Sequence, residues 1–272
     1  MPSKTISILG CGWLGLPLAK NLVELGYPVQ GSTTTPEKLS ILKEAGILPF
    51  LLRCQPKILG ERLDEFFQAD ILFLNIPFRR DLIDPQIYKQ QIDEVISKVE
   101  SSPVDFVIFT SSTSVYPDSI GLITEEDPFQ PDNFRAKILL EIEQALLSNN
   151  HFQSTIIRFA GLYGGTREIG KFLGQKNNIF PGDSPVNLIH LDDCIGIIVE
   201  IIRQGVHGQI FNACADEHPT RKELYTQAAL KIGGNPPSFS DSGQTPFKKI
   251  VSNRKLKEML RYQFKHPDPL RS

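Results

Sequence analysis

Three glycines near the N-terminus constrain the fold more than any other feature of the sequence. They are spaced as G-x-G-x-x-G, after a short apolar run at residues 6–9 and before a run with helical period. This pattern predicts a strand, a tight turn and a helix whose N-terminus binds a diphosphate. The first glycine permits the turn, the second admits the pyrophosphate, and the third lets the helix approach the strand. We therefore expect this turn to bind a dinucleotide through Gly10, Gly12, Trp13, Leu14 and Gly15.

The composition is that of an ordinary globular chain. It has 272 residues, 40% of them hydrophobic, and a net charge of -2, which argues against a general binder of nucleic acid or acidic membranes. No run of about 20 apolar residues predicts a membrane span. The four cysteines form no C-x-x-C pair and no cluster with histidine, so we expect no metal, no disulfide framework and a cytoplasmic protein with reduced thiols.

Apolar runs alternate with helical segments along the chain. The runs are continuous, as in a parallel sheet covered on both faces. The predicted strands are 28–32, 47–52, 70–77, 105–110, 154–159, 187–190 and 210–213. The predicted helices are 13–25, 88–99, 134–148 and 255–260, with others beginning at Thr35-Pro36, Asp192 and Thr220, and a loop is expected at 234–246. The fold class is α/β, a doubly wound parallel (Rossmann) sheet, with residues 1–160 binding NAD(P) and a smaller C-terminal substrate-binding region, 161–272, packed on them.

Polar residues follow several predicted strands, where ligands bind in such sheets. Asn75 and Ile76 should lie under the adenine ribose and diphosphate. At the end of the second strand an acid would bind the ribose 2′-OH and indicate NAD. The chain has Ser32, Thr33 and Thr34 there, and hydroxyls accommodate a 2′-phosphate better than a carboxylate does. The pattern favours NADP, with NAD as the alternative, although a plain Ser/Thr turn would also explain it.

Four segments, in the right order, resemble the extended short-chain dehydrogenases/reductases, the family of nucleotide-sugar epimerases and dehydratases. They are Phe109–Tyr116, which contains the S-S-x-x-V-Y signature, Arg158–Gly164, Asn187–Asp193 and Phe211-Asn212. The sequence is most similar to an atypical branch, the YeeZ-like NAD-dependent epimerase/dehydratase proteins. The resemblance implies an NAD(P) cofactor, a small substrate such as a nucleotide sugar, and a homodimer.

The resemblance also implies catalytic roles. Ser112 matches the serine that hydrogen-bonds the reacting group, and Lys137 matches the lysine of Tyr-x-x-x-Lys, which binds the nicotinamide ribose and lowers the tyrosine pKa. Asn133 stands where that tyrosine should be, and an amide is no proton donor. Tyr116 or Tyr163 could substitute for it, although Tyr116 belongs to a signature that also occurs beside the catalytic tyrosine, which favours a packing role. On the substrate side the sequence offers Tyr163, Arg167 and His190. His190 with Asp192 and Asp193 could also form a metal or acid/base pair, but helix capping by Asp192 explains this pattern more simply.

Two functions remain open from the sequence. One is an NAD(P)-dependent oxidoreductase or epimerase-like enzyme acting on a nucleotide sugar or a similar small carbonyl or hydroxyl substrate. The other is a catalytically silent NAD(P)-binding sensor or assembly protein, which the missing tyrosine motivates. The glycine spacing also resembles that of 3-hydroxyacid and 6-phosphogluconate dehydrogenases, but residues 161–272 do not predict their large helical second domain.

Overall fold

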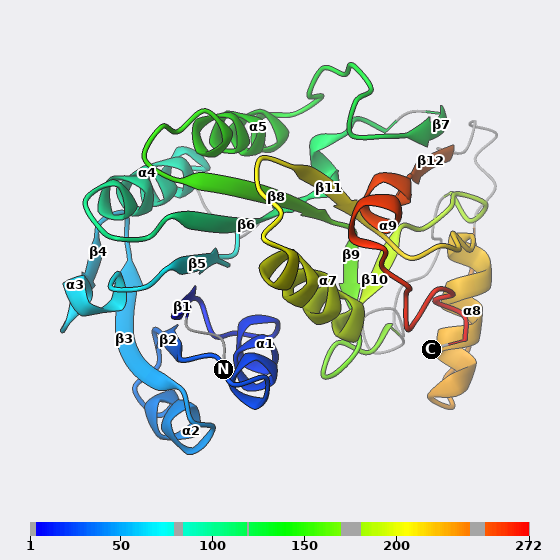
Figure 1. The fold of residues 1–272 in the computed structure, drawn as a ribbon. Coiled ribbons are helices and arrows are strands. Elements are labelled where there is room, and N and C mark those ends of the chain that lie inside the picture. Colours follow the sequence, from blue (N-terminus) through cyan, green and yellow to red (C-terminus); the bar gives the residue numbers. More distant parts are fainter. Residues whose placement is uncertain (1–3, 79–83, 119, 170–180, 240–247, 272) are drawn as a thin grey trace. The chain divides into compact units, whose positions relative to one another are not determined.

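The computed structural model describes residues 4–78, 84–118, 120–169, 181–239 and 248–271 (Figure 1). Its described helices are α1 Gly15–Glu24, α2 Lys38–Glu44, α3 Leu63–Phe66, α4 Gln86–Glu100, α5 Phe134–Leu147, α7 Leu191–Gln204, α8 Arg221–Lys231 and α9 Arg254–Leu260. Its described strands are β1 Ile6–Leu9, β2 Val29–Thr33, β3 Leu48–Cys54, β4 Ile58–Gly60, β5 Ile71–Leu74, β6 Phe106–Ser112, β7 Ile120–Ile123, β8 Gln153–Phe159, β9 Gly161–Tyr163, β10 Leu188–His190, β11 Ile210–Ala213 and β12 Lys248–Val251.

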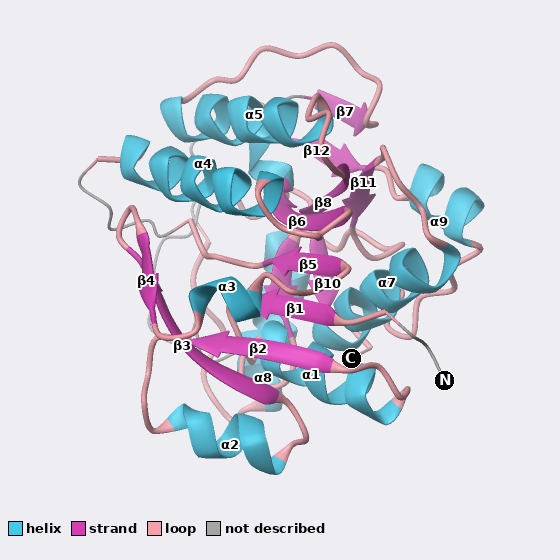
Figure 2. Ribbon diagram, turned by 60° about the vertical axis from the view of Figure 1, so that its left-hand side comes forward, coloured by secondary structure: helices cyan, strands magenta, loops and turns pink. Residues whose placement is uncertain are grey.

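An eight-stranded sheet has the order β11-β8-β6-β5-β1-β2-β3-β4 (Figure 2). The pairs β1–β2, β1–β5, β2–β3 and β5–β6 are parallel, and the short β4 is antiparallel to its neighbour β3. From β1 the chain first builds β2 and β3 on one side and later β5 and β6 on the other. The predicted doubly wound fold is confirmed, and its switch point lies between the ends of β1 and β5, where such sheets bind ligands.

The strands nearest this switch point are completely buried. β1, β2 and β5 are buried at every position. Helices α1 and α2 lie on one face of these strands and α4 and α5 on the other, as Figures 1 and 2 both show. Burial on two faces explains why the apolar runs of the sequence are continuous.

The chain divides into two compact units that interleave along the sequence. Unit 1 is residues 1–115, 131–157 and 205–210, and unit 2 is residues 116–130, 158–204 and 211–272. Unit 2 contains two small parallel pairs, β9–β10 and β7–β12. The predicted division of binding functions at residue 160 stays a prediction.

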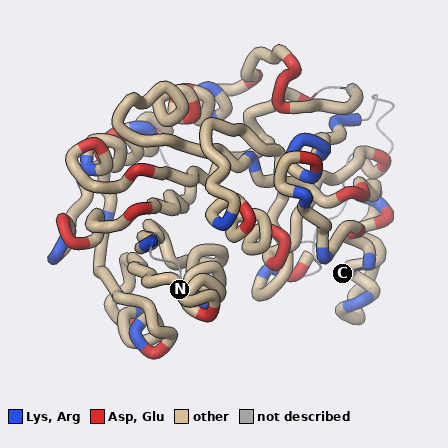
Figure 3. Tube along the Cα trace, in the orientation of Figure 1, with Lys and Arg blue, Asp and Glu red and all other residues tan. Residues whose placement is uncertain are grey.

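Basic and acidic residues are interspersed along the described trace (Figure 3), in keeping with a net charge of only -2. In the described part of the chain, no helix is both long enough and apolar enough to cross a bilayer.

Several predicted boundaries need correction. Helix α1 begins at Gly15, after a turn at residues 11–14, and α2 begins at Lys38. The helix predicted to begin at Thr35-Pro36 has Glu37 as its N-cap, and the Thr35 carbonyl accepts the Lys38 N–H in the turn before it. The short strands β4, β7, β9 and β12 and the single-turn helix α3 were not predicted. Residues 234–239 of the expected loop contain no helix, and 240–246 lie outside the described residues.

The predicted start of α8 is confirmed as a capping box. Thr220 Oγ1 accepts the Glu223 N–H at 3.2 Å, and the Glu223 carboxylate accepts the Thr220 N–H at 2.8 Å. We expect Thr220→Ala to lower the free energy of unfolding by about 1 kcal/mol, because it removes the acceptor of a helix N-terminal N–H. Urea denaturation measures this loss. The exposed Lys222→Ala in the same turn should change it by less than about 0.5 kcal/mol; equal effects of the two substitutions would contradict the cap.

Candidate functional site

The three glycines of the N-terminal turn meet different surroundings. Gly10 has φ +111°, which L side chains rarely adopt, and a Cβ there would collide with the Asn75 carbonyl. A Cβ on Gly15 would overlap the Gly10 carbonyl. Gly12 is exposed, and a Cβ there would meet no described atom within 4 Å. Packing of the chain therefore explains Gly10 and Gly15 but leaves Gly12 unexplained.

Side chains from neighbouring strands hold this turn in place. Gly10 N–H donates to Ser32 Oγ at 2.9 Å, and Cys11 N–H donates to the Ser32 carbonyl at 2.8 Å. Asn75 Nδ2 donates to the Gly10 carbonyl at 3.0 Å. Thr110 Oγ1 donates to the Leu74 carbonyl at 3.2 Å, which ties the end of β6 to that of β5. The carboxyl ends of β1, β2, β5 and β6 are thus linked at the switch point.

The three hydroxyl residues that the sequence predicts to bind the cofactor lie in different environments. Ser32 is buried, with its hydroxyl engaged by Gly10, so it supports the turn. Thr33 is also buried, and its Oγ1 accepts the Thr35 N–H at 3.1 Å. Thr34 is exposed and able to meet a ligand directly. Direct contact of any of the three with a cofactor stays a prediction.

The segment after β5 is anchored by aromatic contacts. Tyr88 donates its hydroxyl to the Ile76 carbonyl at 3.0 Å, and its ring stacks on Phe78 with centroids 4.2 Å apart. The Arg135 guanidinium lies 3.7 Å from the centroid of the Phe78 ring and donates to the Phe78 carbonyl at 2.8 Å. Burial raises the pKa of Tyr88, so this phenol stays protonated. Asn75 and Ile76 are half-buried beside the glycine turn and at the start of this anchored segment.

The two serines at the end of β6 have separate roles. Ser111 is buried and donates to Glu143 Oε1 at 2.5 Å. Ser112 is half-buried, and its Oγ accepts the Ser114 N–H at 3.1 Å, which leaves its own proton to donate. The 3₁₀ turn that follows, η1 Thr113–Val115, packs on α5, the helix that carries the exposed Lys137.

Asn133 is explained by helix capping. Its Oδ1 accepts the Ala136 N–H at 2.9 Å, and its extended backbone makes it the N-cap of α5. The Asn133 carbonyl accepts the Lys137 N–H one turn later, at 3.2 Å. The residue predicted to stand where the catalytic tyrosine should be therefore has a side chain that stabilises the start of the helix.

Tyr116, in unit 2, is fully engaged by neighbours. Its hydroxyl donates to Asn212 Oδ1 at 2.9 Å and accepts from Arg158 Nη1 at 2.7 Å. Burial raises the pKa of this phenol, although the Arg158 charge opposes the shift. These contacts favour the packing alternative. The catalytic role of Tyr116 stays a prediction.

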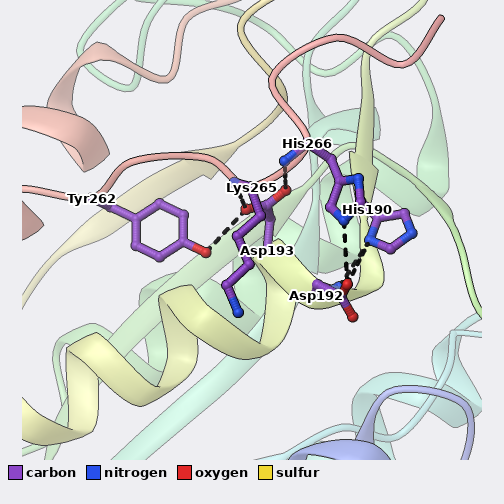
Figure 4. A network of polar contacts seen from close by, with 6 residues as sticks. All are labelled: His190, Asp192, Asp193, Tyr262, Lys265 and His266. Atoms are coloured by element: carbon purple, nitrogen blue, oxygen red, sulfur yellow. Dashed lines mark hydrogen bonds and ion pairs between the residues drawn. The ribbon is translucent and has the colours of Figure 1, made fainter. Parts of the chain in front are cut away.

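The predicted substrate residues lie around β9 and β10 in unit 2. The Tyr163 and His190 rings meet edge to face with centroids 5.1 Å apart. Arg167 is half-buried, and its backbone pairs with Gly164 just after β9. The structure adds a residue that the sequence did not suggest: the His266 ring centroid lies 3.7 Å from that of His190, and both imidazoles approach Asp192 (Figure 4).

Asp193 fastens the segment that carries His266. This buried carboxylate accepts the Tyr262 hydroxyl at 3.0 Å, the Lys265 N–H at 2.7 Å and the His266 N–H at 3.0 Å (Figure 4). Burial and the Asp193 charge raise the pKa of Tyr262, so its hydroxyl remains a donor. Burial and repulsion by His266 lower the pKa of His190, which favours a neutral imidazole.

No protein-family model matches the sequence. Protein YeeZ of Escherichia coli strain K12, however, is 35% identical over 269 residues, which cover 98% of each chain. The chain belongs to the YeeZ family. The predicted membership is confirmed across the full length, including both units.

Solved structures agree on the fold. A functionally unknown conserved protein from Silicibacter pomeroyi superposes with a TM-score of 0.77 at 23% identity, over 98% of this chain and 96% of that one. A putative NAD-dependent epimerase/dehydratase from Methylobacillus flagellatus gives 0.73 at 25%, over 98% and 95%. The UDP-glucuronic acid 4-epimerase of Bacillus cereus, in complex with NAD, gives 0.76 at 18%, over 98% and 94%.

Removing the Asp193 carboxylate should destabilise this YeeZ family member. Asp193→Ala leaves two backbone N–H groups and the Tyr262 hydroxyl without their buried acceptor. We expect a loss of about 3–5 kcal/mol in the free energy of unfolding. Chemical denaturation measures it, with the exposed neighbour Asp192→Asn as the control. A loss below about 1 kcal/mol for Asp193→Ala would show that the network does not fasten the segment.

Proposed function

We propose that the protein binds NAD(P) at the turn from Gly10 to Gly15 and acts as an epimerase-like oxidoreductase on a nucleotide sugar or a similar small carbonyl or hydroxyl substrate. The observation that carries the cofactor part is Gly12. Two glycines of the motif are required by packing, whereas this exposed one has open space where its side chain would be. A diphosphate that approaches the backbone supplies the missing reason for it.

The position of the turn supports the same proposal. It follows β1 at the switch point of the sheet and leads into the N-terminus of α1, where N–H groups and the helix dipole favour an anion. The similar proteins named above include a putative NAD-dependent epimerase/dehydratase and a UDP-sugar epimerase in complex with NAD. Their names supply the substrate class of the proposal.

Ser112 and Lys137 are the residues of unit 1 proposed to act in the reaction. When bound, NAD(P) supplies hydride acceptance and donation at its nicotinamide ring. The Ser112 hydroxyl would donate to the oxygen of the reacting group. The exposed Lys137 ammonium would bind the nicotinamide ribose. Asn133 cannot exchange a proton, so the proton must pass through another group, such as the substrate itself or water.

NADP is the proposed preference over NAD. The end of β2 bears no acid that would repel a 2′-phosphate, while Thr34 and Lys38 are both exposed beyond it. A hydroxyl and a cation at this place favour the phosphorylated ribose.

One observation favours the second candidate, a silent NAD(P)-binding sensor or assembly protein. Asn133 is fixed as a helix cap, and Tyr116 has both hydrogen-bonding positions of its hydroxyl occupied. Neither residue is therefore an evident substitute for the catalytic tyrosine.

Gly12→Ala tests cofactor binding. The methyl group meets no described atom, so the variant should melt like the wild type but bind NADPH at least about tenfold more weakly, a loss of about 1.4 kcal/mol. Calorimetric titration with NADPH and NADH measures the affinities. Gly234→Ala, at another exposed glycine with room for a Cβ, is the matched control and should bind like the wild type. Unchanged affinity in Gly12→Ala would refute the placement of the diphosphate.

Ser112→Ala separates the enzyme from the silent protein. If Ser112 donates to the reacting oxygen, turnover with UDP-sugars should fall about 100-fold while NADPH affinity holds. Ser114→Ala, two residues further on and exposed, is the control. Equal turnover in wild type and Ser112→Ala would remove Ser112 from the mechanism. Absence of turnover in the wild type and in Asn133→Tyr, with tight NADPH binding in both, would favour the silent alternative.

A further inference from the structure

Two histidines and an aspartate of unit 2 bring three ligand atoms together (Figure 4). Asp192 Oδ2 lies 3.6 Å from His190 Nδ1 and 3.2 Å from His266 Nε2. All three atoms lie within 4.8 Å of one another. A tetrahedral ion with bonds of about 2.0–2.1 Å needs ligand atoms roughly 3.3 Å apart. The two distances to Asp192 therefore match such an ion, and the two histidine nitrogens lie within 4.8 Å of each other.

The His190 ring is held with the required atom facing the cluster. Its Nδ1 accepts the Asp192 N–H at 3.2 Å, so this nitrogen carries the lone pair. On the opposite side the ring lies against Gly164, where a Cβ would overlap Nε2, and Tyr163 packs edge-on against it. The Nδ1 lone pair thus faces the Asp192 side of the cluster, and an ion that binds it would displace the weak hydrogen bond from the Asp192 N–H.

His266 is positioned by the neighbouring acid. Asp193 binds the N–H groups of His266 and Lys265, and Tyr262 adds a side-chain contact to the same carboxylate. These bonds hold the main chain of His266 and do not touch its imidazole ring. The main chain at His266 is thus fixed to the first turn of α7, which also carries Asp192.

We propose that His190, Asp192 and His266 bind a divalent transition-metal ion, with Zn²⁺ as the preferred ion. Two imidazoles and one carboxylate suit Zn²⁺, Co²⁺ or Ni²⁺, whereas Mg²⁺ and Ca²⁺ prefer oxygen ligands throughout. Three protein ligands leave a coordination position open, and the 51% exposed side chain of Asp192 gives water access to it.

The site departs from the sequence expectation of no metal for a simple reason. His266 lies 74 residues after Asp192, so no short sequence spacing indicates that His266 belongs to the cluster. Only the fold of unit 2 brings the second imidazole to the Asp192 carboxylate. The inference is independent of the proposed cofactor function, since these residues all belong to unit 2 and the glycine turn belongs to unit 1.

Cobalt substitution tests the site on the full chain, without any nucleotide. The chelator-treated protein is titrated with Co²⁺ and read by its visible absorption, and Zn²⁺ binding is measured by calorimetry. We expect one ion per chain with about micromolar affinity, and loss of at least about 100-fold in His266→Gln and in Asp192→Asn. His151→Gln, at an exposed histidine outside the cluster, is the matched control and should bind like the wild type.

Two results would overturn the proposal. One is the absence of a Co²⁺ absorption band in the wild type at about 100 μM ion, a concentration well above the dissociation constant expected for three such ligands. The other is equal binding by the wild type and both ligand variants, which would show an adventitious surface ion only. Asp192→Asn is included because this side chain is half exposed, so its replacement should leave the protein folded. Circular dichroism of each variant verifies the fold. Either negative result leaves the NAD(P) titrations, and so the proposed function, unaffected.

Discussion

The close approach of backbone to backbone at Gly10 is the constraint on which the arrangement of strands in unit 1 depends. Gly10 lies so near Asn75 and Gly15 that neither it nor Gly15 has room for a side chain. Ser32 and Asn75 then satisfy the polar groups of the turn. This arrangement brings the ends of three strands and the start of α1 together, and no bulky residue at these positions would allow it.

Residues of the same type that lie close together in the sequence have different surroundings in this chain. Gly10 and Gly15 are needed for packing, while Gly12 is left facing open space. The Ser111 hydroxyl donates a buried hydrogen bond to Glu143, while the Ser112 hydroxyl accepts a hydrogen bond and keeps its own proton to donate. In each case the residue that packing does not explain is the one assigned to the ligand, which is a stronger argument than the sequence motif alone.

The sequence predicted the parallel core because burial on both faces leaves a continuous apolar pattern, and β11 lies where that pattern placed it. It did not predict β7 and β12, which pair across more than a hundred residues and are too short to show a period. Contact of Ser32 with a cofactor stays a prediction. The structure adds that its hydroxyl supports the turn, a role that a strand-end hydroxyl in the sequence does not distinguish from ligand binding. The sequence did not indicate His266 at all, since the contact with Asp192 depends on how Asp193 folds the C-terminal segment back onto α7.

Binding of a diphosphate at the exposed backbone of Gly12 can be followed through the backbone amide NMR signals of isotope-labelled protein during titration with NADPH. We expect saturable shifts at Gly12, Trp13 and Leu14 that give a single dissociation constant. Signals of these three amides that stay unchanged up to millimolar NADPH and NADH would contradict binding at this turn.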